Sequence, residues 1–177
     1  MDKILKSDLN SGRGLRTLSK TNRAYNPISY HNGSIWPHDN SLIIEGLRKY
    51  GYRKEANQLI SDIFKASQDF KYYRLPELYC GFGTEEEKTA VEYPTSCSPQ
   101  AWAAGTVFLF LNSMLGIDVD VGNDRIVIKP ELPDFLNEIK VDNLVIAGDT
   151  LSFTVVKENG KNKIRNLTSS PQIEVID

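Results

Sequence analysis

Apolar residues recur at helical spacing in three segments of the first two thirds of the chain. An amphipathic i, i+3, i+4, i+7, i+8 pattern runs through residues 53–69, carried by Ala56, Leu59, Ile60, Ile63 and Phe64. A helix is also expected over residues 40–50, with a stripe of Leu42, Ile43, Leu47 and Tyr50. Asp39 or Asn40 can cap its start, and Gly51 is expected to end it.

A third helix is expected over residues 98–115. Ser98 can cap its start, Pro99 suits the first helical position, and Gly116 follows the end. Its centre, "AWAAGTVFLFLNSML", is apolar nearly all round, which predicts a helix buried on most sides. The sequence offers few other helices to cover it. The pattern therefore indicates part of a larger architecture, or pairing with another copy or another chain.

Residues 121–177 change to short β-branched runs separated by turn signals. The runs are "DRIVIKP", "EIKVDNLVIAG", "TLSFTVVK", "NKIRNL" and "QIEVI". Leu151, Phe153 and Val155 alternate with polar residues, as in a half-buried strand. We therefore expect a mainly helical part over residues 1–120 and a small antiparallel β-sheet after it. The proline-rich "KPELPDFL" is expected to be an irregular crossover.

Composition and charge narrow the class of protein. The chain has 177 residues, of which 40% are hydrophobic and 25% charged, with a net charge of -2; these values are ordinary for a soluble globular protein. No basic tract indicates nucleic acid or an anionic membrane as a partner. No secretory signal or membrane-spanning run is visible, so a cytoplasmic location is expected. Cys80 and Cys97 lack metal-type spacing, which predicts free thiols.

Polar and aromatic side chains concentrate in "YHNGSIWPHDN", residues 30–40, directly before a helix. Trp36 can stack on the apolar face of a sugar, or it can be a core residue. His31 and His38 can bind a ligand or carry protons, although such residues are more often structural. The chain offers no third clear metal ligand for them. Asp39 can cap the helix and bind substrate at the same time.

The connection between the second and third expected helices is longer than the roughly 12 to 15 residues above which loops are usually functional or disordered. Its aromatic, leucine and proline content argues against disorder. Within it, "LPELYCGF" surrounds Glu77 with apolar neighbours that would desolvate a carboxylate, as suits a general acid or base. Alternatively, Glu77 is a surface residue paired with Arg74. Gln100 and Trp102 can face the same pocket, or Trp102 can be core. Arg16 can pair with a carboxylate of the site or lie on the surface.

Four motifs follow one another in the chain: "SGRGLRTLS", "YHNGSIWPHDN", "LPELYCGF" and "YPTSCSPQAWAAG". Together they resemble the C-terminal part of the bacterial and archaeal glycogen-debranching, amylo-α-1,6-glucosidase-like family, over residues 1–120. The resemblance implies a glycoside hydrolase with an (α/α)6 barrel of the six-hairpin glycosidase type, followed by a β-sheet. It also implies that Glu77 is the catalytic base of an inverting reaction on an α-glucan or oligosaccharide. Arg13 departs from the family, which tends to have Trp there.

The same resemblance makes residues 30–40 a sugar-binding rim. We expect the substrate to be bound by Tyr30, His31, Trp36, His38, Asp39, Gln100 and Trp102. No segment matches the family's general acid, which lies earlier in the barrel. A complete six-hairpin barrel needs on the order of 300 residues. The chain therefore resembles the last part of a barrel, inactive without the N-terminal remainder or another copy, and requiring no metal or organic cofactor. The alternative is a non-catalytic carbohydrate-binding or assembly module.

Overall fold

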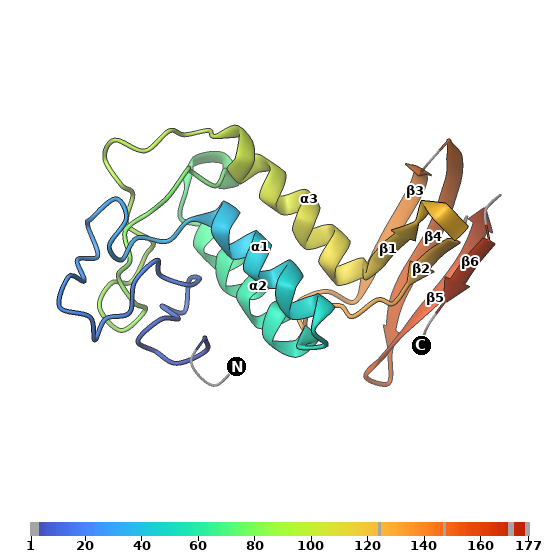
Figure 1. Ribbon diagram of the computed structural model, residues 1–177, viewed down its shortest axis with the longest axis horizontal. Helices are drawn as coiled ribbons and strands as arrows, with labels where there is room; N and C mark the ends of the chain where they lie inside the picture. Colours follow the sequence, from blue (N-terminus) through green and yellow to red (C-terminus); the bar gives the residue numbers. More distant parts are fainter. Residues whose placement is uncertain (1–3, 124, 147, 170–171, 176–177) are drawn as a thin grey trace. The chain divides into compact units, whose positions relative to one another are not determined.

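The computed structural model describes residues 4–123, 125–146, 148–169 and 172–175. The chain divides into two compact units, Met1–Phe110 and Leu111–Asp177 (Figure 1). The first unit contains the long loops and the helices, and the second contains the β-strands. Within the described residues, no helix has the length and apolar character needed to cross a membrane.

The helical unit is built on α1 (Pro37–Lys49), α2 (Arg53–Ser67) and most of α3 (Ala101–Leu115), with the short 3-10 helix η1 (Lys71–Tyr73) after α2. The three α-helices confirm the three predicted ones, but two of them start elsewhere. Helix α1 begins at Pro37 with Trp36 as N-cap, because proline has no N–H to leave unpaired and its fixed φ suits the first position. Capping by Asp39 or Asn40 is therefore wrong, and Asp39 lies in the first turn.

The faces of α2 agree with the prediction, whereas those of α1 do not. Four of the five predicted core positions of α2 are buried: Ala56, Leu59, Ile60 and Ile63. In α1, Ile44 and Leu47 are buried, while Leu42 and Ile43 are exposed. Helix α1 carries apolar residues on two faces, so its periodicity could not identify the one that packs on α2 (Figure 1).

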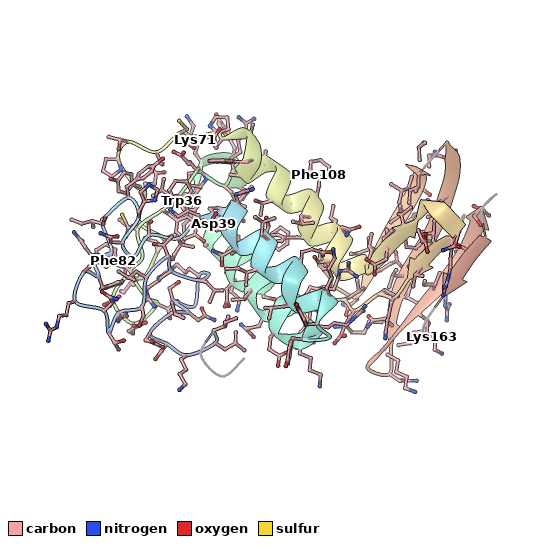
Figure 2. The ribbon with its side chains drawn as sticks, viewed as in Figure 1. Trp36, Asp39, Lys71, Phe82, Phe108 and Lys163 are labelled. Carbon is pink, nitrogen blue, oxygen red and sulfur yellow. The ribbon has the colours of Figure 1, made fainter. Side chains whose placement is uncertain are left out.

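Helix α3 begins at Ala101, so the expected start at residue 98 is wrong. Its buried face includes Ala103, Thr106 and Phe110. Phe110 meets Phe64 of α2 edge-on, with 5.8 Å between ring centroids. Phe108 is 74% exposed and points away from α1 and α2 (Figure 2). Burial on most sides was therefore a wrong prediction for this chain, since the described helices cover only part of α3.

The loops of the helical unit are joined through single residues. Ile35 forms a bridge with Arg16 on one side and with Tyr79 on the other, and Tyr79 also pairs with Glu92. The Ile35 and Tyr79 backbones exchange two hydrogen bonds, of 2.9 and 3.0 Å. Ile35 and Tyr79 are fully buried in one cluster with Phe70. Four segments that are distant in sequence are thereby held side by side.

The strand-rich unit contains two sheets of three strands, not the single antiparallel sheet that was expected. One sheet has the order β1 (Ile117–Asp120), β2 (Arg125–Ile128) and β6 (Gln172–Val175). The other has the order β3 (Glu138–Ile146), β4 (Asp149–Glu158) and β5 (Lys161–Ser169). Strands β2 and β6 pair in parallel. Between them in the sequence, the chain forms β3, β4 and β5 of the other sheet, which serve as the crossover connection that a parallel pair needs. The other pairings are antiparallel.

Five of the six strands lie on the predicted β-branched runs. The exception is β1, whose sequence "IDVD" alternates β-branched residues with aspartates and was not predicted as a strand. Leu151, Phe153 and Val155 of β4 are buried as the alternation predicts, although Thr154 is buried too. "KPELPDFL" has no helix or strand, as expected. The last residue of the predicted run "QIEVI", Ile176, lies outside the described residues.

These elements confirm a helical part followed by a β part. The three described α-helices are too few to close a barrel, so the (α/α)6 toroid stays a prediction. The exposed apolar residues of α1 and α3 are what such a prediction requires, since a barrel covers each helix on more than one side.

Candidate active site

Trp36 is fixed at the entrance to α1 by its ring nitrogen. Its Nε1 donates hydrogen bonds to the Tyr30 carbonyl, at 3.2 Å, and to the Ser34 hydroxyl, at 3.0 Å. The Ser34 hydroxyl donates in turn to the Tyr30 carbonyl at 2.6 Å. These bonds close the loop of residues 30–36 into a compact turn and leave the Trp36 ring in a defined orientation (Figure 2). The indole N–H is thereby satisfied although the residue is buried.

Glu77 is held by both of its carboxylate oxygens. The Tyr30 hydroxyl donates to Oε1 at 2.9 Å, and the backbone N–H of Cys97 donates to Oε2 at 3.4 Å. The Glu77 backbone N–H donates to the Cys97 carbonyl at 2.9 Å. Glu77 is only 8% exposed, and both of its sequence neighbours are buried. The carboxylate is therefore oriented by two donors, and each oxygen keeps a lone pair that can accept a further proton or hydrogen bond.

Tyr30 remains a donor at neutral pH. The hydrogen bond to Glu77 is the main cause that raises the pKa of its phenol, and burial adds to it. The ring of Tyr30 also meets the rings around it edge-on, with centroids at 4.7 Å for His31, 4.9 Å for Trp36 and 5.7 Å for Tyr93. Tyr30 thus links the carboxylate to an aromatic cluster.

The aromatic cluster continues onto α1 and α3. His31 stacks parallel to Trp36 at 5.6 Å, and Trp36 meets Trp102 at 6.4 Å. His38 stacks on Trp102 at 4.9 Å with an interplanar angle of 18°. Trp102 is 46% exposed, so the alternative of a core residue is wrong. The rings therefore form a wall, buried at Trp36 and open at Trp102, of the kind on which a sugar ring can stack.

Two other predicted substrate-binding residues have contacts at the starts of α1 and α3. Asp39 is exposed, and its carboxylate lies 3.6 Å from Nδ1 of His38. The side chain of Gln100 accepts a hydrogen bond from the backbone N–H of Ala101 at 2.9 Å, at the start of α3. The structure thus brings Tyr30, His31 and Trp36 together with Glu77, and adds the stacked His38–Trp102 pair.

Both arginines considered for this region have other partners. Arg16 is buried and donates to the Gly81 carbonyl at 2.6 Å and to the Ser7 carbonyl at 2.9 Å, with Glu86 at 4.0 Å. It is therefore neither a surface residue nor a partner of the Glu77 carboxylate. The guanidinium of Arg74 lies 5.7 Å from the centroid of the Tyr72 ring. The carboxylate partners of Glu77 are Tyr30 and Cys97 instead, so the expected surface pair with Arg74 is wrong.

Sequence reasoning missed three residues that shape this site. Ser34 orients Trp36, and Tyr93 packs on Tyr30. Asn40 fastens the start of α1 to the N-terminal loop through Leu15. Ser34 lies inside the polar motif and could have been considered, but Tyr93 is in a different loop. Only the tertiary structure brings that loop to Tyr30.

Metal binding has no evident place in this arrangement. No group of three or more His, Cys, Asp or Glu side chains is placed to hold a metal ion in the part of the chain that the structure describes.

In a comparison with known protein families, part of the chain matches a glycoside hydrolase domain. Residues 2–83 match the model of the mannosylglycerate hydrolase MGH1-like glycoside hydrolase domain. No curated protein matches the chain. The matched region includes the aromatic loop of residues 30–40 and Glu77, and it ends before the segment that contains Cys97. Residues 2–83 therefore form a glycoside hydrolase-like segment.

Proposed function

We propose that this chain supplies the general base and the sugar-binding wall of an inverting glycoside hydrolase of the debranching, amylo-α-1,6-glucosidase type, which acts on α-glucans. The observation that carries the proposal is the Glu77 carboxylate, buried beside an aromatic wall and oriented by donors on both oxygens. The class of the matched family supports hydrolysis of a glycosidic bond. The debranching specificity rests on the sequence resemblance.

Inverting hydrolysis requires a base that activates water on one face of the sugar and an acid that protonates the leaving oxygen. In this proposal, Glu77 takes the proton of the attacking water. Tyr30 and the Cys97 amide hold the carboxylate, so that its free lone pairs face the substrate. The exposed Trp102 ring binds the apolar face of the sugar ring, and the buried Trp36 ring supports it from behind.

The general acid comes from outside this chain in the proposed enzyme. The remaining barrel helices would cover the exposed apolar residues of α1 and α3, among them Leu42 and Phe108. A second copy of the chain is the other possible source of such helices. We further propose a cytoplasmic enzyme, consistent with two cysteines that remain free thiols.

The substrate has a second candidate. The matched family model is named for a mannosylglycerate hydrolase. A small mannoside of that kind would use the same base and the same wall, but would leave positions beyond the cleaved bond empty. Both substrates therefore belong in the assay.

Replacing Glu77 by Gln tests the base. The chain is mixed with the remaining barrel segment, and release of glucose from branched or short maltosaccharides, or of mannose from mannosylglycerate, is measured. Loss of a general base is expected to slow turnover by roughly 10²- to 10⁴-fold. Glu92→Gln is the control, because Glu92 is an exposed glutamate on a neighbouring segment. Full activity of Glu77→Gln would remove Glu77 from the role of base.

The alternative function is a non-catalytic carbohydrate-binding or assembly module. The observation that favours it is that no segment of the sequence matches the family's general acid, while the exposed aromatic ring of Trp102 is present. This function predicts saccharide binding without turnover, whatever barrel segment is added. The mixing assay separates the two functions.

A further inference from the structure

A cavity of about 410 Å³ opens between α2, η1 and the start of α3. It is lined by Phe64, Ser67, Tyr73, Arg74, Leu75, Pro99, Ala103, Ala104 and Val107. Its size falls within the range of roughly 300 to 1,000 Å³ that is usual for small-molecule sites. The lining is mostly apolar and includes two aromatic rings, those of Phe64 and Tyr73, and one guanidinium. None of these residues has a role in the site around Glu77.

The residues of η1 at this cavity have an unusual backbone conformation. Tyr72 and Tyr73 have φ values of 58° and 57°, in the left-handed region that bulky side chains rarely adopt. Both rings are exposed, that of Tyr73 by 74%. Successive strained residues persist only where the surrounding structure enforces them, and they concentrate at ligand-binding and active sites. Of these two exposed rings, that of Tyr73 lines the cavity.

Two segments that line the cavity also carry the base and its hydrogen-bond partner in the sequence. Arg74 and Leu75 come directly before Pro76 and Glu77 in the sequence, and Leu75 is itself part of the lining. On the other segment, Pro99 lies two residues after Cys97, which is hydrogen-bonded to Glu77. On each segment, a lining residue is therefore two positions from Glu77 or from its partner Cys97.

We infer that this cavity is a second saccharide subsite, which binds a glucose unit of the substrate beyond the one at Glu77. The inference rests on the proposed saccharide site at Glu77 and goes beyond it, because it requires a substrate with at least two glucose units. A pyranose ring offers an apolar C–H face and a rim of hydroxyls. The Tyr73 ring and the apolar floor match the face, and Arg74, which has only donors, matches the hydroxyl oxygens.

Replacement of Tyr73 separates binding from folding. Asn tolerates left-handed φ values better than Tyr, so Tyr73→Asn removes the ring without adding strain. We expect its urea midpoint to equal or exceed that of the wild type. Tyr73→Phe keeps the ring. Tyr50→Ala is the matched control, since Tyr50 is also an exposed tyrosine but lies after the far end of α1.

Calorimetric titration of the full chain with glucose and maltoheptaose provides the test. The wild type should bind maltoheptaose about tenfold more tightly than glucose, the amount expected for one additional stacked ring. Tyr73→Asn should abolish that preference, whereas Tyr73→Phe and Tyr50→Ala should retain it. Equal length preference in Tyr73→Asn and the wild type would overturn the inference. Binding of sodium octanoate in place of maltoheptaose would do so as well, because it would show a site for apolar anions.

Failure of this inference is distinguishable from failure of the proposed function. Glu77→Gln should lose turnover yet keep its length preference, because the subsite does not include the carboxylate. A wild type that cleaves substrate but shows no length preference overturns the subsite and leaves Glu77 as the base. A length preference that depends on Tyr73, without turnover, supports the subsite and favours the binding module.

Discussion

Asn40 joins the N-terminal loop to the start of α1, and its removal should destabilise the helical unit strongly. Its Oδ1 accepts from the Leu15 backbone N–H at 2.7 Å, and its Nδ2 donates to the Leu15 carbonyl at 3.1 Å. Nδ2 also donates to the Trp36 carbonyl at 2.9 Å. Asn40 is 1% exposed, so water cannot replace these bonds without a rearrangement.

The magnitude follows from the groups that Asn40→Ala leaves unpaired. The Leu15 N–H and C=O both lose their partner in a buried place, at about 1 to 3 kcal/mol each. The Trp36 carbonyl keeps the backbone N–H of Asn40, at 3.1 Å, and adds little to the loss. The expected decrease in the free energy of unfolding is therefore about 2 to 6 kcal/mol, a large part of the roughly 5 to 15 kcal/mol that stabilises a domain.

Urea unfolding followed by tryptophan fluorescence measures this loss, because both tryptophans, Trp36 and Trp102, lie in the helical unit. Asn40→Asp keeps the acceptor for the Leu15 N–H and should fall between Asn40→Ala and the wild type. Asn32→Ala, at an exposed position of the loop that precedes α1, should change stability by less than about 0.5 kcal/mol. An Asn40→Ala protein within that margin of the wild type would refute the reasoning.

Two further predictions concern titratable side chains. Cys97 is exposed and Cys80 is buried, and burial raises the pKa of the Cys80 thiol. A thiol reagent should therefore label Cys97 in the native chain and Cys80 only after unfolding, which mass spectrometry can measure. The pKa of the Glu86 carboxyl is lowered, mainly by the hydrogen bond from the Gly83 N–H and further by Lys20. The contribution of Glu86 to stability is therefore complete above about pH 4.5, and it is lost as the pH falls through the folded-state pKa. The NMR shift of the Gly83 amide should accordingly titrate with a midpoint below 4.5, and a midpoint at or above that value would contradict the assignment.

The sequence predicted an element well where one face alone was apolar. Helix α2 carries its apolar residues in a single stripe, and that stripe is buried. Helix α1 has Leu42 and Ile43 beside Ile44, so the chain composition allowed two packing faces. The choice between them depends on contacts with α2, which periodicity does not contain.

The candidate site was predictable as a set of motifs, but its contacts were not. The aromatic loop and Glu77 were both identified from their residue types. The bond from Tyr30 to Glu77, and the contact of Tyr93 with Tyr30, join separate loops and have no local signal. Arg16 shows the same limit, since its partners are backbone carbonyls that any residue could supply.

The single-residue bridge between Ile35 and Tyr79 has a consequence for how this region can vary. Trp36 directly follows one bridged residue, and Glu77 lies two positions before the other. The two backbone hydrogen bonds fix Ile35 opposite Tyr79, so an added or deleted residue between Ile35 and Trp36, or between Glu77 and Tyr79, would displace the tryptophan or the glutamate relative to the other. Substitutions can therefore accumulate around the bridge, whereas these two short spacings must stay fixed for the ring and the carboxylate to keep their relative positions.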